Sequence, residues 1–118
     1  AVLVTDAMAA MGLGEGLFKL GNVEVRIRNN RATVNNTSTL AGSIARMDTC
    51  VRNFKKFTGC STVQALEAAT VRPAIVLGME NKKGRLAVGC DADIILLNDD
   101  LNVQATFVGG ENAWLSPG

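Results

Sequence analysis

The sequence begins with AVLVTDAM, residues 1–8, a short apolar run followed by one acidic residue, Asp6. Residues 2–4 have the composition of a buried β-strand. A carboxylate placed where a buried strand leaves its sheet is a common way to present a catalytic group. The stretch therefore predicts a strand over residues 2–5 and makes Asp6 a candidate catalytic residue, whose companions must lie elsewhere.

A glycine-punctuated loop is expected over residues 9–16, before a small antiparallel meander. The segment VEVRIR, residues 23–28, alternates apolar and charged side chains, which is typical of a strand with one face in water. Asn and Gly tolerate the positive φ that tight turns need. The meander is therefore predicted at about 17–34, with turns at Gly21-Asn22 and Asn29-Asn30.

A loop of small residues at 38–42 is expected to lead into a helix over 43–57. Ser43 is the predicted N-cap of this helix, and Gly59 is its predicted C-terminal stop. Apolar residues recur at steps of three and four along it, as they do on one face of an amphipathic helix. The four residues expected to be buried together are Ile44, Met47, Val51 and Phe54.

Two more helices are expected before the chain returns to strands. One spans residues 61–70 and begins with a capping box, in which Ser61 and Gln64 satisfy each other's backbone N–H groups. The other is short, with Pro73 in its first turn and Gly78 at its end.

The last part of the chain predicts strands across residues 85–97 and 103–115. The run Ile94–Leu97 is continuously apolar, which is typical of a strand buried on both faces. A hairpin turn is expected at residues 109–112, where two glycines occur together.

The composition excludes several classes of function. Twelve Lys and Arg against eleven Asp and Glu give 118 residues a net charge of +1, which indicates neither a nucleic-acid-binding nor a membrane surface. No apolar stretch approaches the ~20 residues needed to span a membrane. Histidine is absent, which excludes Ser–His and Cys–His pairs and a histidine-based zinc site within this chain. Cys50, Cys60 and Cys90 lack metal-like spacing and fit a reduced, intracellular protein.

Four stretches together carry a resemblance to a known family: LVTDAM, TLAGS, VRN and GRLAVGCDADIILLNDDLNVQATFVGG. In this order and spacing they resemble the C-terminal part of the N-acetylglucosamine-6-phosphate deacetylases, within the metal-dependent amidohydrolase superfamily. The stretch 84–97 resembles the closing strands of many amidohydrolases, so it indicates the superfamily but not a family within it. The pairing of VTDAM with TLAGS about thirty residues later points to the deacetylases.

The resemblance implies an α+β fragment: the last strand and helices of a (β/α)₈ amidohydrolase barrel plus the C-terminal part of a small β-sandwich. Residues 1–82 would belong to the barrel, with the meander at about 17–34 inserted, and residues 83–118 would supply sandwich strands. A barrel strand without its neighbours leaves open edges, and helices without their barrel expose apolar faces. Such a fragment is expected to self-associate.

The same resemblance assigns the site residues. It implies that Asp6 takes a proton from a metal-bound water and later delivers it to the departing sugar amine. Leu40, Ala41 and Gly42 match a strip that contacts the bound amino-sugar phosphate. The family's metal ligands, histidines and a glutamate, match no position here. A divalent metal such as zinc or iron is therefore expected in the full-length enzyme and none in this chain.

The function implied is hydrolysis of N-acetylglucosamine 6-phosphate to glucosamine 6-phosphate and acetate, in amino-sugar catabolism, by a cytoplasmic homodimer. The chain alone is expected to be inactive. A dihydroorotase-like or deaminase-like amidohydrolase is one alternative, against which the spacing of TLAGS from Asp6 argues. A non-catalytic scaffold or interaction module is the other, favoured for the isolated chain by its lack of histidine.

Overall fold

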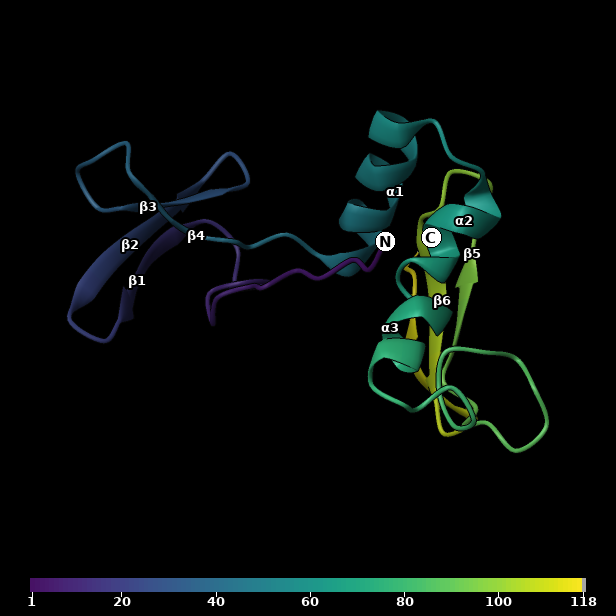
Figure 1. Ribbon diagram of the computed structural model, residues 1–118. Helices are drawn as coiled ribbons and strands as arrows, with labels where there is room; N and C mark the ends of the chain where they lie inside the picture. Colours follow the sequence, from purple (N-terminus) through teal and green to yellow (C-terminus); the bar gives the residue numbers. More distant parts are fainter. Residues whose placement is uncertain (118) are drawn as a thin grey trace. The chain divides into compact units, whose positions relative to one another are not determined.

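The computed structural model describes residues 1–117, which form two compact units (Figure 1). The first, called here the meander unit, consists of residues 4–50. The second, called here the helix–sheet unit, consists of residues 1–3 and of the chain from residue 51 onward. Each unit has its own sheet and its own buried cluster, so each is described by itself.

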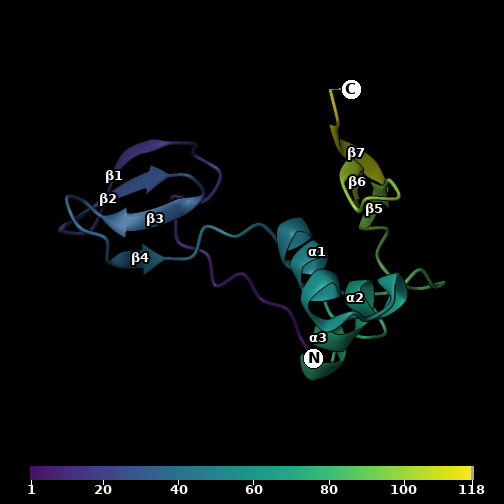
Figure 2. The same cartoon turned by 90° about the horizontal axis from the view of Figure 1, so that it is seen from above.

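The sheet of the meander unit has four antiparallel strands in the order β1-β2-β3-β4 (Figure 2). The predicted meander is confirmed, and so are its two turns, because Asn29 and Asn30 adopt positive φ angles of 52° and 59° between β2 and β3. The strand bounds are β1 Gly16–Leu20, β2 Val23–Arg28, β3 Arg31–Val34 and β4 Leu40–Gly42.

The core of the meander unit follows from the alternation in β2. Val25 and Ile27 point inward and are 1% and 5% exposed, while Arg28 is exposed to solvent. They pack with Ala10 and with Ala32, which is fully buried. The partly buried side chains around this cluster are Met8, Phe18, Leu20, Ala41 and Ile44.

The strand predicted over residues 2–5 is wrong for this structure. These residues are extended but unpaired as a strand. In the helix–sheet unit, the Leu3 N–H donates to the carbonyl of Ala68 at 2.8 Å. A parallel strand needs neighbouring strands to accept and donate its backbone hydrogen bonds. The described residues provide no such neighbours here, so the run stays outside a sheet.

The predicted entry into the first helix is also wrong. Residues 40–42 form β4, which pairs with β3, instead of a loop. Helix α1 spans Met47–Thr58, so Ser43 is not its N-cap. Because residues up to 43 are held in extended backbone by their partners, the helix can begin only after them. The predicted stop is confirmed, since Gly59 follows α1 with a φ of 70°.

The four apolar residues that were expected to be buried together do not share one core. Ile44 packs against the core of the meander unit. Val51 and Phe54 belong to the buried cluster of the helix–sheet unit, which also contains Ala65 and Leu101. Met47 is 38% exposed. The expected single face therefore does not form, because Ile44 precedes the helix and belongs to another core.

The start and stop residues predicted for the two shorter helices are confirmed. Helix α2, Thr62–Glu67, begins with the capping box: the Gln64 N–H donates to Ser61 Oγ at 3.1 Å, and the Ser61 N–H donates to Gln64 Oε1 at 3.0 Å. It is shorter than the predicted 61–70. Helix α3, Val71–Val76, has Pro73 in its first turn, and Gly78 follows with a φ of 68°.

The sheet of the helix–sheet unit contains β5 Ile94–Leu97, β6 Val103–Val108 and β7 Glu111–Leu115, antiparallel in this order. The strands and hairpin predicted over 103–115 are confirmed. Of the strands predicted across 85–97, only Ile94–Leu97 forms, since residues 85–93 consist of turns, bends and irregular backbone. The expected burial of β5 on both faces is wrong as well, because Ile95 and Leu96 are 47% and 52% exposed.

The turn between β5 and β6 is tied to α1. Leu101 adopts a positive φ of 61° and is 7% exposed in the buried cluster. Asn98 Oδ1 accepts hydrogen bonds from the N–H groups of Asp100 and Asn102, and the Arg52 guanidinium donates to the Leu101 carbonyl at 2.9 Å. These bonds hold a conformation that a leucine rarely adopts by itself.

Three further findings concern the chain's organisation. The predicted division at residues 82 and 83 concerns the complete enzyme and stays a prediction, since the two units of this chain divide elsewhere. Cys50, Cys60 and Cys90 are free thiols of intermediate burial. Within residues 1–117, no helix is long and apolar enough to cross a membrane.

Candidate active site

The meander unit brings the two predicted site segments together. Ala7 forms a parallel bridge with Ser43, and the Met8 N–H donates to the Ser43 carbonyl at 2.8 Å. Asp6 immediately precedes the first residue of this bridge, and Gly42 immediately precedes the second. The backbone of Asp6 and the end of the strip Leu40–Gly42 are therefore neighbours in one unit, although more than thirty positions separate them in sequence.

Asp6 occupies an unusual backbone conformation. Its φ is 45°, in the left-handed region that residues other than glycine seldom adopt. Aspartate is among the side chains that tolerate this region best. The residue is exposed to solvent, at the end of the extended run that opens the chain. Strained backbone of this kind is frequent where a functional side chain must point in a particular direction.

The strip Leu40–Gly42 is β4, at the edge of the four-stranded sheet. Gly42 pairs with the fully buried Ala32, and Ala41 packs against the core. Leu40 is 66% exposed. An edge strand has backbone N–H and C=O groups that its sheet leaves unpaired. A ligand contact at this strip would thus use the backbone of an edge strand and not a loop that leads directly into a helix, because α1 begins at Met47.

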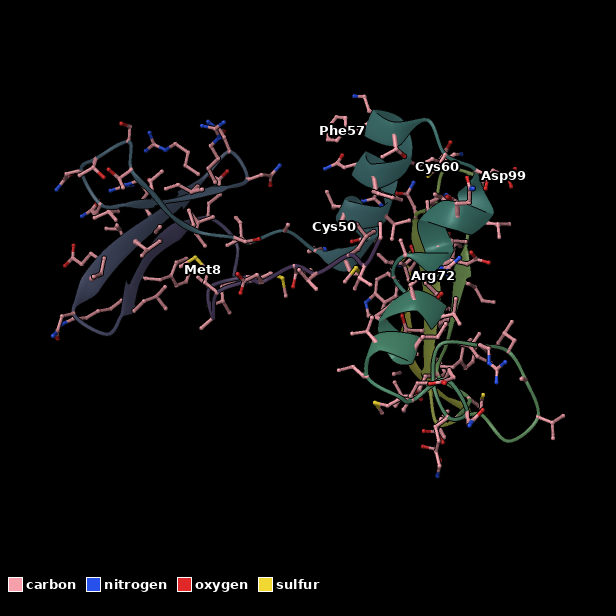
Figure 3. All side chains as sticks on the ribbon, in the orientation of Figure 1. Met8, Cys50, Phe57, Cys60, Arg72 and Asp99 are labelled. Atoms are coloured by element: carbon pink, nitrogen blue, oxygen red, sulfur yellow. The ribbon has the colours of Figure 1, made fainter. Side chains whose placement is uncertain are left out.

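Met8, which stands two residues after Asp6 in VTDAM, lies next to this site. Met8 packs against Gly42, where a Cβ atom built on Gly42 would lie 3.2 Å from the Met8 sulfur. Figure 3 labels Met8 and shows its sulfur in yellow. The sequence indicates a place for Met8 near the site only by its position close to Asp6. It does not show the contact with Gly42, because a parallel pairing with residue 43 leaves no pattern among neighbouring residues.

The described residues do not provide the set of ligands that a catalytic metal ion needs. Histidine is absent, and no group of three Cys, Asp or Glu side chains in the described residues is arranged to hold a metal ion. The geometry therefore supplies carboxylate chemistry at Asp6 and backbone hydrogen bonding at β4.

A second charged cluster, in the helix–sheet unit, has a structural role. Lys83 forms ion pairs with Asp93 and, at 2.9 Å, with Asp91. Asp93 Oδ1 also accepts the N–H of Gly109 at 3.0 Å. The hydrogen bond from Lys83, then that from Gly109, lowers the pKa of Asp93, and the two carboxylates raise the pKa of Lys83. The cluster ties the loop before β5 to the β6–β7 turn, and sequence reasoning recognised only a turn there.

Comparison with known proteins places the chain in a family. The model of the amidohydrolase family matches residues 3–113, nearly the entire sequence. The chain belongs to the amidohydrolase family. This match includes both Asp6 and the strip at β4, together with the helices and all of β5 and β6.

Individual relatives of this amidohydrolase chain are more specific. It is 54% identical over 113 residues to N-acetylglucosamine-6-phosphate deacetylase from Bos taurus, covering 96% of the chain and 28% of that protein. The chain thus spans little more than a quarter of the length of the curated relatives that it matches. A crystal structure of N-acetylglucosamine-6-phosphate deacetylase from Thermotoga maritima is similar with a TM-score of 0.82 and 38% identity, over 98% of the chain and 31% of that structure.

A third similarity involves a bound ligand. An aspartate-to-alanine variant of N-acetyl-D-glucosamine-6-phosphate deacetylase from Mycobacterium smegmatis was solved in complex with N-acetyl-D-glucosamine-6-phosphate. It is 36% identical to this amidohydrolase chain with a TM-score of 0.78, over 94% of the chain and 30% of that structure. The roles of Asp6 and of residues 40–42 in this chain stay predictions.

Proposed function

We propose that the complete protein hydrolyses N-acetylglucosamine 6-phosphate to glucosamine 6-phosphate and acetate, and that this chain contributes Asp6 and the β4 strip to its active site. The observation that carries the proposal is the bridge from Ala7 to Ser43, which brings these two segments together. The high identity to deacetylases over nearly the whole chain supports the choice of substrate.

In this proposal, Asp6 moves the proton of the reaction. Its carboxylate accepts a proton from the attacking water as the new C–O bond forms at the acetyl carbon. The same group then donates that proton to the amide nitrogen, which leaves as the amine of the sugar when the C–N bond breaks. One carboxylate suits both steps, because it is a base before the first transfer and an acid after it. Its exposure leaves it accessible to substrate.

The β4 strip binds the sugar phosphate in this proposal. Its backbone groups at the sheet edge offer hydrogen bonds to the sugar phosphate. The exposed Leu40 adds apolar contact beside the sugar ring. Any catalytic metal of the enzyme would be held by residues outside this chain, since the donors here do not form a ligand set.

The finer architecture forms part of the same proposal. Residues 1–82 would complete a (β/α)₈ barrel with the meander inserted, and residues from 83 onward would belong to a β-sandwich. In the complete barrel, residues 2–5 would gain the neighbouring strands that they lack here. We also propose a cytoplasmic homodimer for the complete enzyme. The isolated chain would release no acetate from the substrate, and would self-associate through its exposed apolar side chains.

The test is Asp6→Asn in the complete enzyme. This change keeps the size of the side chain but removes the proton-carrying oxygen, so kcat should fall by at least ~10²-fold, the usual lower range for general acid–base catalysis. The KM should change little, because binding rests on other groups. Acetate release and bound metal are measured on the same preparations. The control is Asp99→Asn, an exposed aspartate in the turn after β5 (Figure 3), which should leave kcat unchanged.

Two outcomes would contradict the role given to Asp6. Near-normal kcat in Asp6→Asn would make the residue a structural cap of its loop. Loss of metal together with activity would make it a ligand first and a proton carrier second.

A further inference from the structure

We infer that Met8 and Gly42 act as a positioning pair that sets the place of Asp6 relative to the β4 strip. The inference rests on the proposed function of Asp6 and extends it to two residues that do not carry the proton themselves. It concerns the meander unit alone, in which all of these residues lie.

The contact between the two residues is close. A Cβ atom on Gly42 would lie 3.2 Å from Met8 Sδ, and 3.7 and 3.8 Å from its Cβ and Cγ. The first distance is shorter than ordinary van der Waals contact, so the side chain of Met8 fills the space that a side chain at residue 42 would need. An alanine at this position would therefore press on the Met8 side chain, although the backbone angles of Gly42 lie outside the left-handed region that favours glycine.

The other side of Gly42 cannot give way. Gly42 pairs with Ala32 in the adjacent strand, and Ala32 is fully buried in the core with Val25 and Ile27. Moving β4 outward would break that pairing and open the core. A larger residue at position 42 must therefore displace Met8, whose unbranched thioether can adapt its conformation.

Displacement of Met8 acts on the segment that carries Asp6. The backbone of Met8 is held by its hydrogen bond to Ser43, and its side chain packs against the core of the meander unit. Asp6 lies only two residues earlier, in a left-handed conformation that needs support from its surroundings. A shift of a few tenths of an ångström at Met8 is thus expected to turn the Asp6 carboxylate away from its proton-transfer geometry.

The experiment is a double-mutant cycle in the complete enzyme, with Gly42→Ala, Met8→Ala and the double variant. We expect kcat to fall about 10-fold in Gly42→Ala, because small misplacements of a catalytic group are costly. In Met8→Ala it should fall about 3-fold, through loss of support for the loop. The double variant should resemble Met8→Ala, since the shorter side chain leaves room for the new methyl group. Independent effects would instead multiply to about 30-fold.

Two further measurements separate positioning from simple destabilisation. The pH–rate profile of Gly42→Ala should shift on the limb that reports Asp6, and the double variant should restore it. The melting temperature of Gly42→Ala should stay close to that of the wild type, whereas Met8→Ala should melt lower because it removes a side chain that packs against the core. The control is Gly21→Ala in the same unit, whose added Cβ would meet nothing within 4 Å but whose φ of 60° strains an alanine, so that it lowers stability without touching Met8. It should leave kcat unchanged and show no coupling to Met8→Ala.

The outcomes distinguish this inference from the function on which it rests. If Asp6→Asn lowers kcat but the effects of Gly42→Ala and Met8→Ala simply multiply, the positioning pair is refuted and the role of Asp6 survives. An unchanged kcat and pH profile in Gly42→Ala would refute the pair as well. If Asp6→Asn has normal kcat, the proposed function itself fails, whatever the cycle shows.

Discussion

The two sheets of this chain use their apolar residues differently. In the meander unit, β2 buries Val25 and Ile27 against a cluster built wholly from that unit. In the helix–sheet unit, Ala105 is the buried residue of β6, and β7 is exposed along its whole length. The large apolar side chains that stay exposed on this second sheet include Ile95, Leu96, Val108, Trp114 and Leu115.

The two strand patterns need different numbers of covering layers. The alternating VEVRIR of β2 has one apolar face and needs one covering layer, which its own unit supplies. The continuous IILL of β5 is apolar on both faces and needs two layers. The described residues do not cover Ile95 and Leu96, as expected of a chain that spans 28% of the length of its relatives. A locally complete pattern therefore folds locally, and an incomplete one depends on the rest of the protein.

The largest predicted effect contrasts one valine in each sheet of the 118-residue chain. Val25→Asp places a carboxylate at a position that is 1% exposed, where it finds no partner, and should destabilise the meander unit by more than about 4 kcal/mol. Val108→Asp changes a residue that is 59% exposed, and should alter the free energy of unfolding by no more than about 0.5 kcal/mol. Urea unfolding combined with amide hydrogen exchange resolves each unit separately.

Equal destabilisation by the two aspartates would break the comparison, since it would mean that the second sheet is covered in solution. Protection of the β2 amides in Val25→Asp would show instead that the meander unit does not depend on its small core.

An intermediate effect is expected at the loop before β5, where Gly84 closely approaches Thr70 and Ala74. A Cβ on Gly84 would lie 2.7 Å from the Thr70 carbonyl oxygen and 2.9 Å from Ala74 Cβ, at a φ of 85°. Gly84→Ala should therefore cost about 3 kcal/mol, from backbone strain and steric overlap together. Gly89→Ala is the matched control, because its φ is 91° but nothing lies within 4 Å.

The control should cost only about 1 kcal/mol, the strain of a left-handed alanine. Thermal unfolding of both variants, read from the fluorescence of Trp114, measures the difference. If the two variants melt together, the close approach of Gly84 to α3 is not present in solution.

The smallest predicted effect is the pH dependence of the ion cluster at the β6–β7 turn. The pKa of Asp93 is lowered from its ordinary 3.8, first by the hydrogen bond from Lys83 and then by that from Gly109. Its stabilising contribution is therefore present above pH 3.8 and is lost as the pH falls through the lower folded pKa. Lys83 has a raised pKa, so its contribution is present below pH 10.5 and is lost only at still higher pH.

The measurement compares the melting temperature of the wild type with that of Asp93→Asn from pH 6 to pH 2. The wild type should lose more stability across the acid range, by a small amount, because the groups are partly exposed to solvent. The difference should shrink at about 1 M salt, where charges are screened within ~3 Å. Identical acid profiles would mean that the ion cluster contributes nothing to stability.

Features coded by neighbouring residues could be predicted from sequence. The meander followed from a period of two and from Asn29-Asn30, whose positive φ angles allow the tight turn. The capping box of Ser61 and Gln64 followed from their spacing alone. The two site segments were found by resemblance, and the sequence could not show that they touch, since the bridge from Ala7 to Ser43 joins distant positions.

Strands β1–β3, the β6–β7 hairpin and the caps of the short helices could all be predicted from the amino-acid sequence, because their signals lie within a few residues of one another. Only the tertiary structure decided that residues 40–42 form a strand, that α1 begins at Met47, and that Ile44 packs in a different core from Val51. The physical reason is that strand pairing and burial depend on partners far along the chain. In residues 40–43, the backbone N–H and C=O groups find hydrogen-bond partners in β3 and next to Ala7. These distant partners replace the hydrogen bonds that a helix would supply, so the segment is not helical despite its local preference.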